Sequence, residues 1–138
     1  MIKSTSILFL LFYLVSCSSS HKWPGGIITD DGVYENNGLK IIVTDHDHSI
    51  DYVVFDSKGG TLIKSDRKFS SFQRWALHLD RDQNLWVFSS DVGDACWKIE
   101  PTNKKYIKRE FYGLISKDSI PGEVYNTLKH FHPYNSQE

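Results

Sequence analysis

Short apolar runs alternate with polar turns along most of the chain, and this rhythm predicts β-strands. From Leu39 onward the runs begin about 10 to 13 residues apart, which is the spacing typical of an antiparallel sheet. Helical periodicity is absent from this region. The predicted strands are residues 39–44, 50–56, 61–65, 74–79, 85–90, 95–100 and 105–111. We therefore expect a mostly β fold, an antiparallel meander of about seven short strands that is sandwich-like or an open barrel, with one short C-terminal helix.

Two of these strands are apolar on both faces, whereas a third strand alternates. Tyr52-Val53-Val54-Phe55 and Leu85-Trp86-Val87-Phe88 offer no polar face to water, so we expect both strands to be central, with something packed on each side of the sheet. In residues 74–79 the apolar side chains share one face, and Arg74 and His78 share the other. That strand is predicted to be covered on one side only.

A helical pattern follows the last predicted strand and supplies a candidate cover for the sheet. Residues 123–129 place Val124, Tyr125 and Leu128 on one side. The run Phe131-His132-Pro133 is expected to end this helix, since proline cannot continue it.

The turns differ in length, and an up-and-down meander would sort them to opposite ends of the sheet. The tight polar turns are residues 57–60, 81–84 and 101–104. The longer connections are residues 45–49, 66–71 and 91–94, with residues 112–117 after the last strand. Rigid scaffolds commonly present binding loops in this way, and the hypothesis requires Asp47 and Asp91 to lie at the same end. The candidate binding residues are Asp45, His46, Asp47, His48, Arg74, Ser90, Asp91 and Asp94.

The N-terminus reads as a targeting segment rather than as part of the fold. Lys3 precedes an apolar run of nine residues, 7–15, which is of signal-peptide length and too short to span a bilayer. The run closes with Leu14-Val15-Ser16-Cys17, which resembles the lipobox of bacterial lipoprotein precursors.

The lipobox resemblance implies a location in the cell envelope and a lipid anchor. It implies that the Cys17 thiol receives a diacylglycerol, that the chain is cut before Cys17, and that the new amine is acylated. Such lipid chains hold a protein on a membrane essentially permanently. The implied division is a signal peptide at 1–16, a lipidated tether at 17–32 and a single β-rich domain at 33–138. Ser18, in place of aspartate, resembles the sorting signal for the outer membrane, facing the periplasm, if the source is Gram-negative.

Composition and cysteine content bear on nucleic-acid binding and on the state of Cys96. Sixteen basic and seventeen acidic side chains give a net charge of −1 with no basic run, so an electrostatic grip on nucleic acid is unsupported. No cofactor is expected. Once Cys17 carries lipid, Cys96 has no disulfide partner within the chain, and we expect it to be a buried thiol.

One stretch resembles a single repeat of the sensor-type β-propellers. Within residues 79–99 the matching positions are Asp80, Leu85-Trp86-Val87, Ser89 and Gly93. Residues 55–62 echo the same pattern weakly. Since a closed propeller needs at least about four blades, the resemblance implies hairpin chemistry, not a propeller.

Two clusters of side chains could bind a metal ion or act as a serine hydrolase, and each also has a purely structural interpretation. Asp45-His46-Asp47-His48, with Asp51 nearby, could share a metal ion on an extended backbone; the alternative is a solvated hairpin loop. Ser89-Ser90-Asp91 with His78 invites comparison with serine hydrolases, but no Gly-x-Ser-x-Gly elbow is present. Serine and aspartate at a strand end are more simply turn formers.

The tryptophans allow two interpretations as well. Arg74 and Asp91 near Trp75, Trp86 and Trp97 suggest a polar and aromatic recognition surface. The alternative is a core of tryptophans with a buried Arg–Asp pair that braces two strands.

The preferred functional hypothesis is a non-enzymatic, lipid-anchored module of the cell envelope. It would recognise a protein or a cell-wall partner through membrane-distal loops; immunity to a toxin delivered into the envelope is one such role. The rival is a small metal- or carboxylate-dependent envelope hydrolase that uses residues 45–51.

Overall fold

The computed structural model of the chain describes residues 21–22, 26–111 and 122–131. The predicted signal peptide and Cys17 lie outside this part of the chain. Within it, no helix is long and apolar enough to cross a bilayer. The strands are β1 (His21–Lys22), β2 (Ile27–Ile28), β3 (Gly32–Asn36), β4 (Leu39–His46), β5 (Ser49–Phe55), β6 (Thr61–Lys64), β7 (Phe69–Ser70), β8 (Trp75–Leu79), β9 (Leu85–Ser89), β10 (Asp94–Ile99) and β11 (Tyr106–Phe111), and the helix is α1 (Gly122–Phe131).

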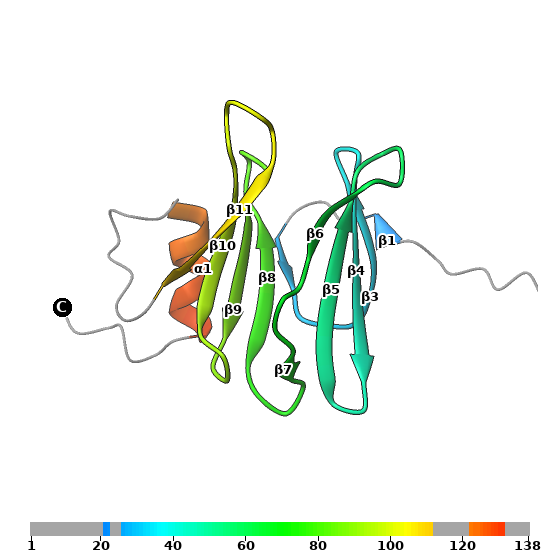
Figure 1. Cartoon of the computed structure of the whole chain (residues 1–138). Coiled ribbons are helices and arrows are strands. Elements are labelled where there is room, and N and C mark those ends of the chain that lie inside the picture. The colour runs from blue at the N-terminus through cyan, green and yellow to red at the C-terminus, as the bar shows by residue number, and fades with distance from the viewer. Residues whose placement is uncertain (1–20, 23–25, 112–121, 132–138) are drawn as a thin grey trace, which may run out of the picture.

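The strands form two sheets that pack face to face (Figure 1). Sheet A has the order β1-β3-β4-β5-β6, with β7 beside β5, and sheet B has the order β11-β10-β9-β8-β2. Paired strands are antiparallel, except that β1 runs parallel to β3. Neither sheet closes into a barrel. The predicted fold class, a mostly β antiparallel meander with one short C-terminal helix, is confirmed, and the described residues add four strands to the seven predicted: β1, β2, β3 and β7.

The core lies between the two sheets because each contributes one apolar face. Along β4 up to Thr44, and along all of β5, buried and partly exposed residues alternate, so every second side chain points inward. The inward residues include Ile41 and Val54, which are completely buried and share one core cluster with Leu77 and Leu85 of sheet B. Because one face of each sheet is buried in this core, the register of the hairpins is fixed: a slip by one residue would turn the apolar side chains outward.

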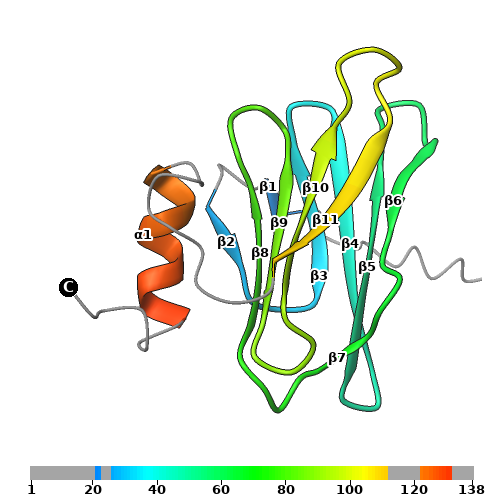
Figure 2. The ribbon, with the colours of Figure 1, turned by 60° about the vertical axis from the view of Figure 1, so that its left-hand side comes forward.

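Helix α1 covers the outer face of sheet B (Figure 2). Val124 is fully buried in a second apolar cluster with Ala76, Trp86, Phe88 and Cys96. The helix predicted at residues 123–129 is therefore confirmed. Cys96 is a buried free thiol, as predicted, and burial raises its pKa to about 12.

The predictions about one-sided and two-sided strands need correction in two places. Strand β8 is buried on both faces rather than one, because Val124 of α1 packs in one cluster with Ala76, on the face of β8 that also carries His78. Strand β9 is central and covered on both faces, as predicted. Strand β5 is central too, but Val53 and Phe55 are partly exposed, since no described element packs over the outer face of sheet A (Figure 1).

The predicted tether at residues 17–32 extends too far into the chain. Ile27 and Ile28 form β2, pairing with His78 and Leu77 of β8, and Ile28 is buried in the core. Gly32 already begins β3. The turn-rich composition concealed this pair of isoleucines, because two apolar residues carry no periodicity. Ile28 becomes buried only where β2 pairs with a strand about fifty residues away.

Candidate functional site

The longer connections meet at one end of the sandwich, called here the loop end and made of residues 45–49, 70–74 and 89–94. The backbone N–H of Ser71 donates to the His48 carbonyl oxygen at 3.0 Å, and that of Ser90 donates to the Arg74 carbonyl oxygen at 3.0 Å. The Ser70 N–H donates to the Asp91 carboxylate at 3.0 Å. Asp47 and Asp91 therefore lie at the same end, as the meander required.

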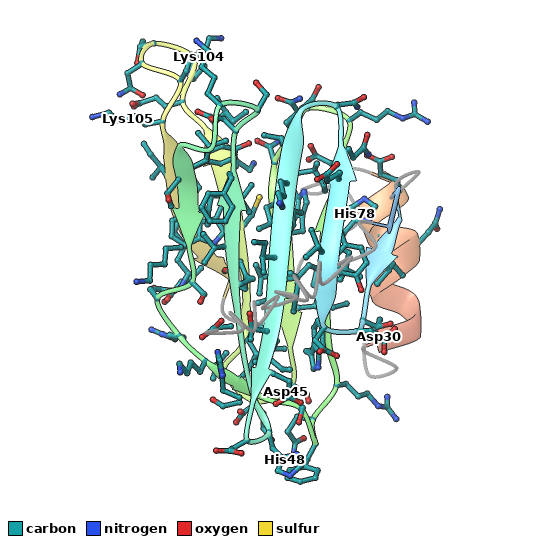
Figure 3. The ribbon with its side chains drawn as sticks, turned by 90° about the vertical axis from the view of Figure 1, so that its right-hand side faces the viewer. Asp30, Asp45, His48, His78, Lys104 and Lys105 are labelled. Carbon is teal, nitrogen blue, oxygen red and sulfur yellow. The ribbon has the colours of Figure 1, made fainter. Side chains whose placement is uncertain are left out.

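The opposite end, called here the tight-turn end, holds residues 36–39, 56–60, 80–84 and 100–105. Figure 3 shows the separation: Asp45 and His48 lie at one extreme of the molecule, and Lys104 and Lys105 at the other. The two ends differ in charge. The turns at the loop end carry four carboxylates, on Asp45, Asp47, Asp91 and Asp94, and one cation, Arg74, whereas the four turns of the tight-turn end carry equal numbers of each sign.

The tip of the β4–β5 hairpin is built by two consecutive residues in the left-handed conformation. Asp47 has φ 51° and His48 has φ 66°, between the paired His46 and Ser49. Two-residue hairpin turns of this kind match the twist of the strands, although a non-glycine residue in this region costs roughly 1 to 2 kcal/mol. The turn exposes the side chains of Asp45, His46, Asp47 and His48 to solvent.

The exposed side chain of Phe72 rests on this tip. Its ring is 76% exposed, and its centroid lies 4.2 Å from that of the His48 ring, with the planes inclined at 32°. The Phe72 N–H donates to the Ser70 hydroxyl at 3.2 Å, and the Ser71 hydroxyl lies 3.5 Å from His48 Nδ1. The Phe72 side chain therefore presents a large apolar area to solvent at the loop end.

Phe72 is not among the binding residues predicted from the sequence. Its only signal was an aromatic residue within the polar run Ser71-Phe72-Gln73, and nothing local distinguishes an exposed ring there from a buried one. Phe69, three residues earlier, is buried in the core, so the difference is decided by which side of the loop faces sheet B.

The β9–β10 turn is held by the serine and aspartate side chains that invited a hydrolase comparison. The Ser89 hydroxyl accepts hydrogen bonds from the N–H groups of Asp91 and Val92, both at 3.2 Å, and Asp94 accepts from the Ser89 N–H at 3.1 Å. These side chains act as turn formers. His78 pairs with Trp86 further along the sheet, about 13 Å along β8 from Arg74 at the loop end, so the structure does not bring it to the serines.

The predicted arrangement around the tryptophans is correct in one part and wrong in another. Trp75 and Trp86 are buried, and the partly buried Trp97 donates its indole N–H to the Tyr52 hydroxyl at 2.8 Å. These three tryptophans therefore belong to the core and do not form a recognition surface. Arg74, however, is exposed and forms no salt bridge within the described residues, so the bracing between β8 and β9 comes from backbone and serine contacts, not from a buried Arg–Asp pair.

The metal interpretation of residues 45–51 finds no assembled ligand set. Among the described residues, no group of three or more histidine, cysteine, aspartate or glutamate side chains is placed to hold a metal ion. Asp51 instead lies 3.6 Å from the Lys68 ammonium group. The exposed tip offers single ligands rather than a converging site.

Comparison of the chain with protein-family models, with curated proteins and with solved structures finds no match. The site must therefore be interpreted from its own residues.

Proposed function

We propose that this chain is a lipid-anchored module of the cell envelope that binds a protein or cell-wall partner through its loop end, without catalysing a reaction. The anchor is the lipid expected on Cys17, from the lipobox resemblance. A Gram-negative source would place the module on the outer membrane, facing the periplasm. The hydrolase alternative remains a prediction that no particular contact favours.

The observation that carries this proposal is the exposed Phe72 on a preorganised loop end. Phe72 is supported from below by His48, and three connections are tied together by backbone hydrogen bonds. A rigid aromatic side chain loses little conformational entropy when it binds, which is why such residues dominate the binding energy of many interfaces. Surrounding carboxylates supply polar contacts at the rim.

The binding function is tested by replacing Phe72 with alanine. Wild-type protein and the Phe72→Ala variant would be compared in sedimentation with purified cell-wall sacculi and in crosslinking to envelope proteins in intact cells. We expect binding to fall by roughly thirtyfold or more in the variant, because removing a central aromatic anchor costs about 2 kcal/mol or more.

The matched control is Ile107→Ala. Ile107 is also a large apolar residue that is substantially exposed, but it lies on β11 opposite Lys98, toward the tight-turn end. The control should bind like the wild type. Equal binding by Phe72→Ala and wild type, or no binding by the wild type in either assay, would remove the basis for the proposal.

A further inference from the structure

The described structure begins very close to the predicted lipid anchor. Strand β1 starts at His21, four residues after Cys17, and four residues of extended chain span at most about 14 Å. Because β1 pairs with Tyr34 and Glu35 of β3, the spacer ends at the edge of sheet A. A lipid on Cys17 would therefore hold this sheet near the membrane instead of letting the domain float on a long tether.

The outer face of sheet A carries an apolar row that no described element covers. Val33, Ile42 and Val53 are aligned across β3, β4 and β5 by the strand register, and all three are partly exposed. Phe55 lies in the next row toward the tight-turn end, opposite Lys40. Figure 3 looks onto this face.

Lysines outnumber carboxylates around this apolar row: the two carboxylates are Glu35 of β3, which pairs with Lys40, and Asp56 in the β5–β6 turn. Lys40 pairs with Phe55, Lys64 pairs with Val53, and exposed Lys58 lies in the adjoining β5–β6 turn. The next outward row toward the loop end is the polar pair Thr44 and Asp51. Apolar side chains beside lysines are the combination that favours the surface of a bilayer containing anionic lipids.

We infer that the tight-turn half of the outer face of sheet A rests on the lipid headgroups, with Ile42, Val53, Phe55 and Lys40 in contact. This inference rests on the proposed lipid at Cys17. The acidic loop end lies about 17 Å further along the sheet, from the level of Ile41 to His46, and repulsion from anionic headgroups tilts it away from the bilayer. Phe72 is then held at a fixed distance and orientation from the membrane.

Lipid-dependent quenching tests this arrangement on the full-length lipidated protein. A nitrobenzoxadiazole label would be attached at Ile42→Cys, at Asp45→Cys or at Lys105→Cys, while Cys96, which is fully buried, stays unlabelled; the unsubstituted protein checks this. The vesicles would contain phosphatidylethanolamine and phosphatidylglycerol, with and without brominated acyl chains. We expect the label at position 42 to lose most of its fluorescence, the label at 45 to lose less and the label at 105 to lose none.

A pair of matched charge reversals separates specific docking from mere proximity. Lys40→Glu with Lys64→Glu should relieve the quenching at position 42, whereas Lys104→Glu with Lys105→Glu, on a turn of the other sheet, should leave it unchanged. Equal quenching at 42 and 105, or none at 42, would overturn the inference. A label at 42 that is shielded only in a dimer would assign the face to a second copy of the chain and would overturn it as well.

Flotation with the vesicles distinguishes failure of the side-on docking of sheet A from failure of the proposed lipid anchor. If the wild-type protein floats but position 42 is not quenched, only the side-on docking is wrong. If the protein does not float, or Cys17→Ser floats equally well, the lipid anchor itself is wrong.

Discussion

The carboxylate of Asp80 organises the β8–β9 hairpin from within the protein. One oxygen accepts the backbone N–H groups of Asp82 at 2.9 Å and Asn84 at 2.8 Å, and the other accepts the indole N–H of Trp86 at 2.9 Å. Asp80 is only 6% exposed. This one side chain therefore closes a turn and also satisfies a buried donor beneath α1.

Asp56 repeats the turn-closing half of this arrangement in sheet A. Its carboxylate accepts the N–H groups of Lys58 and Gly60, both at 2.8 Å, and the backbone bonds of the two turns correspond. The likeness of residues 79–99 to a propeller repeat, and its weak echo at residues 55–62, thus reflect one kind of aspartate-closed hairpin. A short motif of this kind determines a turn and leaves the assembly of the sheets open.

Replacing Asp80 with alanine should lower the free energy of unfolding by about 2 to 4 kcal/mol, because several N–H groups would lose their acceptor at a buried position. Asp80→Asn keeps one acceptor oxygen and should cost less. Urea unfolding followed by tryptophan fluorescence measures both. The control is Asp82→Ala, an exposed turn position where we expect a change within about 0.5 kcal/mol. Similar losses for Asp80→Ala and Asp82→Ala would contradict the role assigned to Asp80.

His78 makes the stability of the domain depend on pH. It is 6% exposed, and both of its ring nitrogens are buried. Burial lowers its pKa below the ordinary value of 6.5, although the carboxylates of Glu123 and Asp80 oppose this shift. Since the unfolded chain then binds a proton more readily, stability is complete above about pH 6.5 and falls as pH drops toward the lower folded-state pKa.

Urea midpoints measured from neutral pH down to about pH 5 should show this loss in the wild type, since the ordinary histidine pKa falls in that interval. His78→Phe and His78→Gln should both flatten the slope, whatever their effect on overall stability. A slope that is unchanged in both variants would assign the pH dependence to other groups.

At the scale of elements, α1 depends on its contact with sheet B. A helix of ten residues is marginal in isolation, so its stability comes from burying Val124 against Trp86 and Cys96. Glu123 adds an exposed link at its N-terminus, accepting the Arg81 backbone N–H at 3.2 Å and lying 3.5 Å from its guanidinium group. The apolar contact outweighs this link, since exposed ion pairs contribute little.

If α1 separates from sheet B, the Cys96 thiol should react faster with a thiol reagent. In a Cys17→Ser background Cys96 is the single thiol, and its burial and raised pKa protect it. Val124→Asp places a charge in the apolar cluster and should increase the rate of reaction with dithiodipyridine at least tenfold, which corresponds to about 1.4 kcal/mol of opening free energy.

The matched control for this experiment is Asn126→Asp, which adds the same charge at an exposed position of the helix. It should leave the reaction rate unchanged. Far-ultraviolet circular dichroism would check that the sheets persist in Val124→Asp. Slow reaction of Cys96 in that variant, with the sheets intact, would show that something other than α1 protects the thiol.

At the scale of the whole molecule, charged side chains tie the two sheets together along one side. Lys108 of β11 contacts Asp66 at 2.8 Å and Glu110 at 3.1 Å, and Arg67 contacts Glu110 at 3.0 Å. Partial burial works against ionisation of Asp66, but the hydrogen bond and the charge of Lys108 outweigh it and lower the pKa of that carboxyl. Among the described elements, α1 covers the outer face of sheet B, whereas none covers the outer face of sheet A.

The anchor is the prediction that concerns the whole molecule most directly. Cells supplied with an alkyne-bearing palmitate should incorporate it into the wild-type protein and into Cys96→Ser, because the thioether and amide linkages are expected at Cys17. Cys17→Ser should incorporate none and should leave the membrane fraction. Labelling of Cys17→Ser equal to that of the wild type would place the lipid elsewhere.

The sequence by itself determined what depends on local patterning. Alternation and turn chemistry predicted seven strands, their up-and-down order, the helix at 123–129 and the gathering of Asp47 and Asp91 at one end, since chain order and turn length decide which connections share an edge. The lipobox resemblance is equally local, because it depends on a linear motif, and the anchor that it implies stays a prediction. These features needed no knowledge of distant contacts.

Only the tertiary structure decided which faces are covered and which loop residue is exposed. The sequence predicts that β8 is covered on one face, but the packing of α1 buries the second face as well. The sequence also predicts that the isoleucines of β2 belong to a tether, but they pair with β8. Phe69 and Phe72 lie three residues apart in one polar stretch of the sequence, yet Phe69 is 2% exposed and Phe72 is 76% exposed. Burial is set by long-range packing between segments, so the apolar stripe that faces solvent and the aromatic residue that is free to bind emerge only when the two sheets meet.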